Sequence, residues 1–211
     1  MKRSVLIIFL LLTCLSLSAQ PHFYQAEKHF SVGGGYSNIH MNAGNFHAGY
    51  LEGTYYMNPT LGWEFYTRFE YGKDYLSFDP AGLLGLPIWI YSTSHNLSRE
   101  SKFIGAMLSI ASAKLPIAIG YDGYFEVAPY WSLLKLTRLY DDRLRIHGDL
   151  GLQFKLFPIA FLNWYNTLYI SGFIQWNWAY GRSNYYGRYN LKNNRSDFFG
   201  YTWGVQIGYY F

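Results

Sequence analysis

Apolar and polar residues alternate along the last part of the chain. From Phe199 to Phe211 the odd positions are aromatic or aliphatic, whereas the even positions are Gly, Thr, Gln and one Tyr. Because successive side chains of a strand point to opposite faces, one face of this segment is apolar throughout. Aromatic rings at both ends of that face, with aliphatic residues between them, match the two aromatic girdles of a membrane-spanning strand. We therefore predict a transmembrane strand here.

The same alternation recurs along the chain. Residues 61–72, 144–156 and 168–181 each alternate over at least the 9–11 residues that a tilted spanning strand requires. Weaker alternation predicts four more strands, at residues 30–38, 46–57, 115–120 and 124–136. In the last of these the apolar parity changes near Leu133 and Leu134, which predicts a β-bulge.

Together these segments predict an all-β fold, a closed antiparallel up-and-down transmembrane β-barrel of eight strands. Closed bacterial barrels have an even number of strands, short periplasmic turns and longer outer loops. With both termini in the periplasm, the periplasmic connections are residues 58–60, 121–123 and 157–167, and the outer ones are 42–45, 73–113, 141–142 and 183–196.

The longest outer connection, residues 73–113, leaves three interpretations open: a loop, a helix, or an extra strand pair that would make ten strands. Phe103, Met107 and Ile110 stand at helical spacing, with Ile104 and Leu108 beside them. This pattern favours a short helix over the mouth of the barrel.

The first twenty residues have the three parts of a secretory signal. Lys2 and Arg3 precede an apolar stretch, and small residues ending at Ala19 predict cleavage near 19/20 and export through the Sec pathway. Cleavage before Cys14, as in a lipoprotein, fits poorly because Thr13 is not small. The predicted organisation is a signal peptide at 1–20, a short tail at 21–28 and a barrel domain at 29–211.

Composition narrows the function classes. Aromatic residues make up 21% of the chain and charged residues 14%, which excludes a disordered secreted protein. Loss of the signal removes two of 17 Lys and Arg, so that 15 face 13 Asp and Glu and the net charge falls from +4 to +2. No basic run with interleaved aromatics occurs, so nucleic acid is not an expected partner. The only cysteine lies in the signal, and we expect no cofactor.

Several segments resemble the small porin-like outer-membrane β-barrel family. The likeness is carried by the run Gly44-Asn45-Phe46-His47-Ala48-Gly49-Tyr50, the Asn58-Pro59-Thr60 turn with residues 63–71, the hairpin of residues 114–119 and 124–130, and the terminal Gly208-Tyr209-Tyr210-Phe211. The resemblance implies the barrel fold and location in the outer membrane, and it carries over no catalytic residue. Residues 73–113 depart from the family pattern.

The final strand is also a candidate assembly signal. A terminal Phe after alternating apolar residues resembles the strand that the barrel-assembly machinery reads, since an exposed strand can pair with a sheet edge. That machinery and outer-membrane lipid are therefore expected partners. The candidate residues are Trp203, Val205, Ile207, Tyr209 and Phe211.

The inward face of the predicted strands carries charges of both signs. They could form a catalytic or transport site, but an eight-stranded barrel is only wide enough to be filled by its own side chains, and buried charges must be paired. We therefore predict a neutralised polar plug. Its members are Glu52, Glu64, Arg68, Glu70, Glu126, Arg145, His147, Asp149 and Lys155.

Catalysis and metal binding have little support in the sequence. A lipid-modifying acyl-transfer enzyme would need His47 on the lipid face with a serine and an acidic partner, and no such combination stands plausibly beside it. No two histidines have metal-ligand spacing. We therefore expect no catalytic and no metal-binding residue.

The leading hypothesis is an integral outer-membrane barrel with a structural or surface-binding role through its outer loops. A lipid-modifying enzyme and a narrow diffusion pore are the alternatives. The loop residues that could contact a surface ligand or protein partner are Tyr185, Tyr186, Arg188 and Tyr189, since exposed aromatic clusters favour such contacts. Anchoring of the same rings at the upper girdle explains them equally well.

Overall fold

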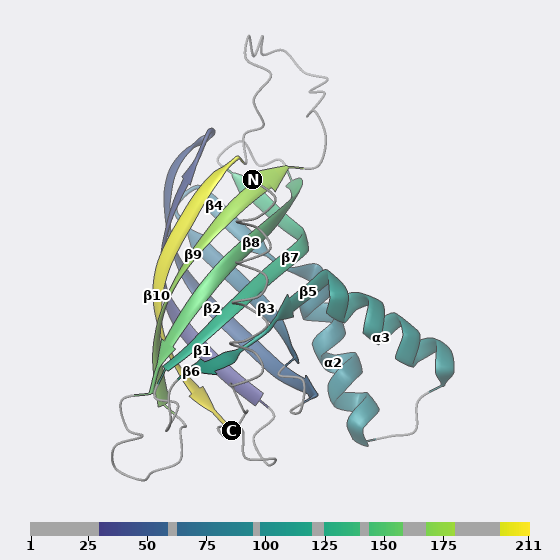
Figure 1. Ribbon diagram of the computed structural model, residues 1–211. Helices are drawn as coiled ribbons and strands as arrows, with labels where there is room; N and C mark the ends of the chain where they lie inside the picture. Colours follow the sequence, from purple (N-terminus) through teal and green to yellow (C-terminus); the bar gives the residue numbers. More distant parts are fainter. Residues whose placement is uncertain are drawn as a thin grey trace, which may run out of the picture.

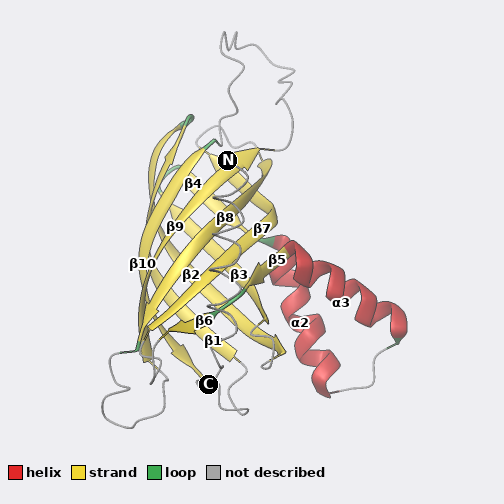
Figure 2. Cartoon of the chain, viewed as in Figure 1, coloured by secondary structure: helices red, strands yellow, loops and turns green. Residues whose placement is uncertain are grey.

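The computed structural model describes residues 30–58, 63–94, 98–119, 125–139, 144–157, 168–179 and 199–211. Strands surround a central axis, and α2 and α3 stand apart from them on one side (Figures 1 and 2). The elements are β1 Phe30–Met41, β2 Gly44–Asn58, β3 Trp63–Gly72, β4 Tyr75–Phe78, α2 Pro80–Ser94, α3 Arg99–Ala111, β5 Ser112–Lys114, β6 Ile117–Ile119, β7 Phe125–Leu139, β8 Leu144–Leu156, β9 Leu168–Ala179 and β10 Gly200–Tyr210.

The strands pair antiparallel all the way round, so the sheet closes on itself. β1 pairs with β2 on one side and with β10 on the other, which joins the two ends of the chain. From β2 the ring runs through β3, the pair of segments β4 and β5, and then β7, β8 and β9 to β10. Because β4 and β5 share one position between β3 and β7, the ring has eight positions. The predicted closed eight-stranded barrel is confirmed.

The fourth position is interrupted. β4 pairs with both neighbours and ends at Phe78, after which the chain leaves the wall as α2 and α3 and returns to it at Ser112 as β5. The prediction that residues 73–113 form an outer connection is therefore wrong, although the helical spacing in its second half does mark α3. The two helices project from the side of the barrel and do not cover its mouth (Figure 1).

A bulge in β7 lies opposite this interruption. The register with β8 shifts between Ser132 and Lys135, and both Leu133 and Leu134 point outward between them. The bulge predicted from the change of apolar parity is confirmed. Its effect is to restore the inward direction of Lys135, which a regular strand would have placed on the outer face.

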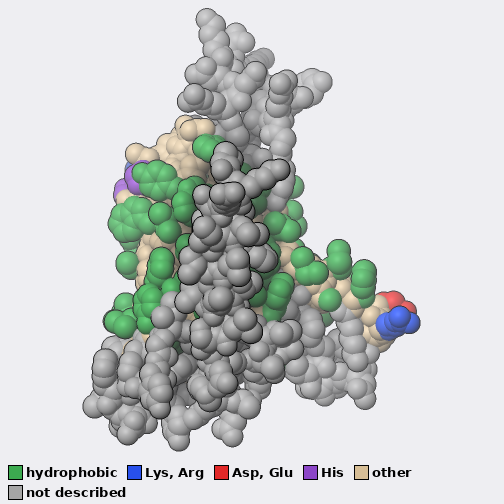
Figure 3. Space-filling model, viewed as in Figure 1, with side chains coloured by type: hydrophobic (Ala, Val, Ile, Leu, Met, Phe, Trp, Pro, Cys, Tyr) green, Lys and Arg blue, Asp and Glu red, His purple; other side chains and the backbone are tan. Residues whose placement is uncertain are grey.

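The two faces of the wall differ in chemistry. Outward positions carry exposed apolar side chains such as Leu51, Leu150, Trp176 and Ile207, and Figure 3 shows them spread over the visible face of the barrel. Inward positions are buried and mostly polar, and they include ten charged side chains or histidines besides their Ser, Thr, Gln and Tyr neighbours: Glu52, Glu64, Arg68, Glu70, Lys114, Glu126, Lys135, His147, Asp149 and Lys155. The core of this protein is therefore polar, and its apolar surface faces out.

Candidate functional site: the polar interior

Strand register brings the interior charges into opposite pairs. Glu52 on β2 stands directly across from Arg68 on β3, because the two strands are antiparallel neighbours and both residues point inward. Glu64 faces Lys114 in the same way across β3 and β5, and Glu126 faces Lys155 across β7 and β8. Cross-strand neighbours on one face are close enough to interact directly, and two of these register pairs, Glu52–Arg68 and Glu126–Lys155, are direct ion pairs. Lys114 instead contacts Glu52, and Glu64 lies near Lys155.

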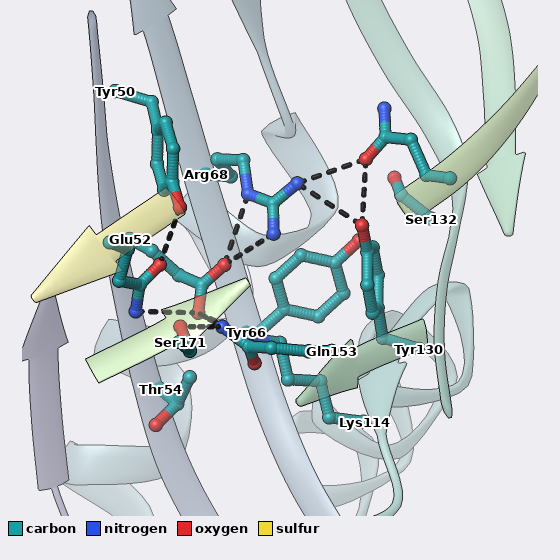
Figure 4. A network of polar contacts seen from close by, with 12 residues as sticks. Tyr50, Glu52, Thr54, Tyr66, Arg68, Lys114, Tyr130, Ser132, Gln153 and Ser171 are labelled. Atoms are coloured by element: carbon teal, nitrogen blue, oxygen red, sulfur yellow. Dashed lines mark hydrogen bonds and ion pairs between the residues drawn. The ribbon is translucent and has the colours of Figure 1, made fainter. Parts of the chain in front are cut away.

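Arg68 lies at the centre of a network of polar contacts in the interior (Figure 4). Its Nε and Nη2 donate to Glu52 Oε2 at 3.0 and 2.6 Å, and its Nη1 donates to Gln175 Oε1 at 2.9 Å. The guanidinium carbon also lies 4.1 Å from the ring centre of Phe173 and 5.0 Å from that of Tyr130. Arginine suits this position because a planar, weakly hydrated cation can pair and stack at once.

Lys114 is the second cation on Glu52. Its Nζ donates to Glu52 Oε1 and, at 2.7 Å, to Gln153 Oε1, while Gln153 Nε2 donates to Ser171 at 3.1 Å. The ring of Tyr66 covers the ammonium from another side, with 5.0 Å between Nζ and the ring centre. Glu52 is thus held by cations at both of its oxygens.

A second group of charges centres on Lys135. Its Nζ lies 2.9 Å from Glu70 Oε2 and 3.1 Å from Asp149 Oδ2, so one ammonium joins two carboxylates from opposite strands. Tyr75 donates to Glu70 at 3.2 Å and Tyr66 donates to Asp149 at 3.3 Å. This group depends on the bulge, since the bulge turns Lys135 inward.

A third group centres on Lys155, near the end of β8 and opposite the start of β7. Its Nζ lies 2.8 Å from Glu126 Oε1 and 3.8 Å from Glu64 Oε2. Tyr210 on β10 accepts a hydrogen bond from this ammonium and donates one to Glu64 Oε1 at 3.2 Å. In all three groups, every buried Lys or Arg of the described interior contacts a carboxylate.

The predicted interior residues lie as follows. Eight of the nine are at most 2% exposed: Glu52, Glu64, Arg68, Glu70, Glu126, His147, Asp149 and Lys155. Arg145, the second residue of β8, is only half-buried. Two further interior cations, Lys114 and Lys135, were not predicted. The predicted fourth strand begins one residue after Lys114, and Lys135 points inward only because of the bulge.

His47 lies on the outer face of β2 and is exposed. Its Nδ1 shares a short hydrogen bond with the hydroxyl of Tyr36 on β1, and the two rings stack with 6.0 Å between their centres. Within the described residues the partner of His47 is therefore a phenol, where an acyl-transfer triad would have a serine or a carboxylate. The described residues also contain no group of three or more His, Cys, Asp or Glu that could hold a metal ion.

The candidate assembly signal forms the outer face of β10, and its side chains are 41–60% exposed. These are Trp203, Val205, Ile207, Tyr209 and Phe211. The candidate contact residues Tyr185, Tyr186, Arg188 and Tyr189 lie outside the described residues.

Comparisons with known proteins find likeness in shape alone. No protein-family model and no curated protein matches the sequence. Among solved structures, the attachment invasion locus protein Ail of Yersinia pestis matches with 11% identity and a TM-score of 0.40, over 87% of this chain and 97% of that one. Neisserial surface protein A matches with 8% identity and a TM-score of 0.42, over 87% and 97%. A de novo designed protein, TMB2.3, matches with 10% identity and a TM-score of 0.37, over 88% and 97%. At these values the comparisons assign no role.

Proposed function

We propose that this protein is an integral outer-membrane β-barrel with a closed interior, which acts as a structural element and presents its outer connections at the cell surface. The observation that carries the proposal is the inverted arrangement of the wall: paired charges fill the inside, and apolar side chains cover the outside.

The outer face supports a lipid environment. Leu51, Val205 and Ile207 are 62%, 53% and 60% exposed, and similar side chains follow every long strand around the ring. Exposing this surface to water would cost about 25 cal/mol for each Å² of apolar area. Exposed apolar patches on soluble proteins seldom exceed a few hundred Å². The predicted secretory signal and the aromatic girdles support the outer membrane as the destination.

The interior supports a closed barrel. Arg68, Lys114, Lys135 and Lys155 all point into the barrel, and each has a carboxylate in direct contact. Aromatic rings from four strands pack between them, among them Tyr50, Tyr66, Tyr130 and Phe173. A conducting pore needs a continuous file of water, whereas here side chains bond to side chains across the lumen.

The surface role rests on the sequence. The outer connection between β9 and β10 contains the tyrosine-rich segment with Arg188, and aromatic residues on a rigid scaffold favour contact with a glycan or a protein. Both strands that carry this connection belong to the closed ring, so the scaffold for such a contact is rigid.

Reconstitution tests the proposal. The protein purified in detergent should migrate as a compact species in SDS until it is heated, and in a planar bilayer it should give no stable open state, whereas a large-pore porin measured in parallel does. Full solubility without detergent would refute the membrane location. A long-lived ion-conducting state of the unmodified protein would refute the closed interior and favour a diffusion pore.

An epitope inserted at residue 188 tests the surface role separately. Antibody should reach the epitope in intact cells as well as in permeabilised ones. Binding only after permeabilisation would place this connection in the periplasm and refute surface presentation, while leaving the closed barrel in place.

A further inference from the structure

The α2–α3 hairpin leaves the wall at about half its height. The last residue of β4, Phe78, pairs with Phe69 of β3, and the returning β5 places Ala113 beside Phe65. The gap therefore faces residues 66–68, the middle of a strand that runs from Trp63 to Gly72. At about 3.3 Å per residue this point is roughly 10–15 Å along the strand from the lower end of β3. With a strand tilt of about 35–45° this is a depth of roughly 8–12 Å, inside the hydrocarbon layer of a bilayer about 30 Å thick.

The hairpin is attached firmly at this point. Asp79 accepts hydrogen bonds from the Gly82 amide at 2.9 Å, which caps α2, and from the Ser112 hydroxyl at 2.5 Å, which joins the exit of the hairpin to its return. The Ser112 hydroxyl also lies within hydrogen-bonding distance, 2.8 Å, of the Tyr66 carbonyl, which connects the return of the hairpin to β3. Trp131 of β7 donates to the Ile110 carbonyl at 2.8 Å.

These contacts matter in lipid. Backbone polar groups that are left open in hydrocarbon cost several kcal/mol each, so a break in the wall is tolerated there only when side chains cover it. Two glycines then bring α2 directly against the wall: a Cβ on Gly82 would lie 2.4 Å from the Tyr66 carbonyl, and one on Gly85 would lie 2.3 Å from the Phe65 ring. Phe65 faces outward by its position in the strand and is fully buried under α2.

Several large apolar side chains are exposed on the described part of the hairpin. On α2, Leu83 and Leu84 are 57% and 60% exposed. On α3, Phe103 and Met107 are 66% and 54% exposed, and Ile104 and Ile110 are exposed to a similar degree. Both helices contact β7, the strand that carries the exposed Leu133 and Leu134 of the bulge. Exposed apolar side chains are therefore present on the wall and on both of the helices that adjoin it.

Charge is confined to the far end. Among residues 80–111 the charged residues are Arg99, Glu100 and Lys102, within the first four residues of α3. Figure 3 shows the basic and acidic side chains at the tip, away from the barrel. Glu100 is ionised at neutral pH, and hydrogen bonds from its own amide and from Ser98 lower its pKa further.

Length and direction agree with one leaflet. Neither helix among the described residues is long and apolar enough to cross a membrane. At 1.5 Å per residue, helices of 15 and 13 residues measure roughly 20 Å, which is enough to reach the headgroups from mid-depth at a slant. In Figure 1 the hairpin slants towards the end of the barrel at which the chain terminates, and this end is periplasmic in the proposed orientation.

We propose that the α2–α3 hairpin is embedded in the periplasmic leaflet of the membrane, with its apolar surface among the phospholipid acyl chains and its charged tip at the phosphate groups. The inference rests on the proposed membrane location. We assign lipid as the partner of the hairpin surface for two reasons. The hairpin adjoins the outer face of the barrel, which faces lipid in the proposed location. The basic residues at its tip would then lie beside anionic headgroups, as in an interfacial amphipathic helix.

Depth-dependent fluorescence quenching tests the proposal. In a Cys14→Ser background, single cysteines replace Met107 on the hairpin, Arg99 at its tip, or Val205 on the barrel wall as the matched control, and each carries an environment-sensitive dye. The labelled proteins are placed in vesicles of phosphatidylethanolamine and phosphatidylglycerol with bromine at defined acyl depths. Heat-modifiable migration in SDS confirms that each variant is folded.

We expect the dye at 107 to be quenched by acyl-chain bromine to a similar extent as the dye at 205, and the dye at 99 to respond mainly to shallow bromine. Quenching at 205 but not at 107, with 107 open to aqueous iodide, would place the hairpin in water and refute this inference alone. Protection of 107 from both quenchers would show that protein covers it, a second copy being one such cover, and would also refute it. Absence of lipid quenching at 205 would instead refute the membrane location.

Discussion

Replacing Arg68 by alanine should destabilise the folded barrel more than any comparable change on its outer face. The guanidinium is 1% exposed, and its removal takes one of two cations from Glu52. It also removes the donor that Arg68 supplies to the Tyr130 hydroxyl and to Gln175 Oε1, which then keeps only the bond from Tyr130. Breaking a buried ion pair by removing one partner costs about 3–5 kcal/mol, because the remaining charge stays buried. Lys114 still contacts the other oxygen of Glu52, so we expect the lower half of that range, with a smaller addition from the cavity beside Phe173.

The measurement is the free energy of unfolding in urea, from protein folded into lipid vesicles, followed by the fluorescence of the seven tryptophans. Arg138→Ala is the matched control, since it makes the same chemical change at an exposed position near the end of β7. An exposed ion pair contributes about 0–1 kcal/mol, so the control should lose at most that much. Equal losses in the two variants would show that the interior pairs do not stabilise the fold.

A double-mutant cycle sharpens this test. Glu52→Gln removes the shared carboxylate, and both Arg68 and Lys114 lose their partner. The effects of Arg68→Ala and Glu52→Gln should therefore not add, with a coupling of about 0.5–3 kcal/mol. Strict additivity would refute a direct interaction between the two side chains in the folded protein.

The remaining predictions concern the hairpin and the wall. Gly85→Leu should displace α2 from the Phe65 ring and destabilise the protein by about 1–3 kcal/mol, whereas Gly49→Ala, whose added Cβ would meet nothing nearer than 3.9 Å, should have little effect on the urea midpoint. Asp79→Ala removes the cap of α2 and the link to Ser112; it should cost about 1–2 kcal/mol and increase trypsin cleavage at the hairpin tip in vesicles, and unchanged cleavage would refute an anchoring role. Arg68→Ala should not convert the barrel into a stable pore, because the aromatic rings of the interior remain, and a long-lived conductance in this variant would show that Arg68 alone closes the lumen.

Much of the fold could be predicted from the sequence, because a barrel wall in lipid obeys a simple rule. Every residue on one face meets hydrocarbon and every residue on the other meets the lumen, so strict alternation marks the long strands and their inward charges. The bulge was visible for the same reason, since two successive outward leucines break the alternation. Pairing could then be inferred from the order of the strands.

The hairpin could not be predicted by that rule. β4 has four residues, too few to show a period, and an insertion into a barrel is expected at its ends and not in the middle of a strand. Helix α2 also lacks the polar face that identifies a surface helix, because one side lies on an apolar wall and the other carries exposed leucines. Lys114 was missed for a related reason: a three-residue strand gives no pattern from which its direction could be read.

The interior contacts also constrain how the barrel can form. Tyr210 bonds Glu64 across 146 residues of sequence, and Arg68 bonds Gln175 across 107. Neither Tyr210 nor Gln175 is available until the last strands have paired. In a sheet that contains only the first strands, Glu52, Glu64 and Arg68 would therefore lack many of their partners and the cover of the far wall. Partly closed sheets are therefore penalised, and the two outermost strands must meet before the membrane becomes a favourable place for the chain. The interior that closes the finished barrel thereby makes its insertion a cooperative event, with the arrival of β10 as the step that completes it.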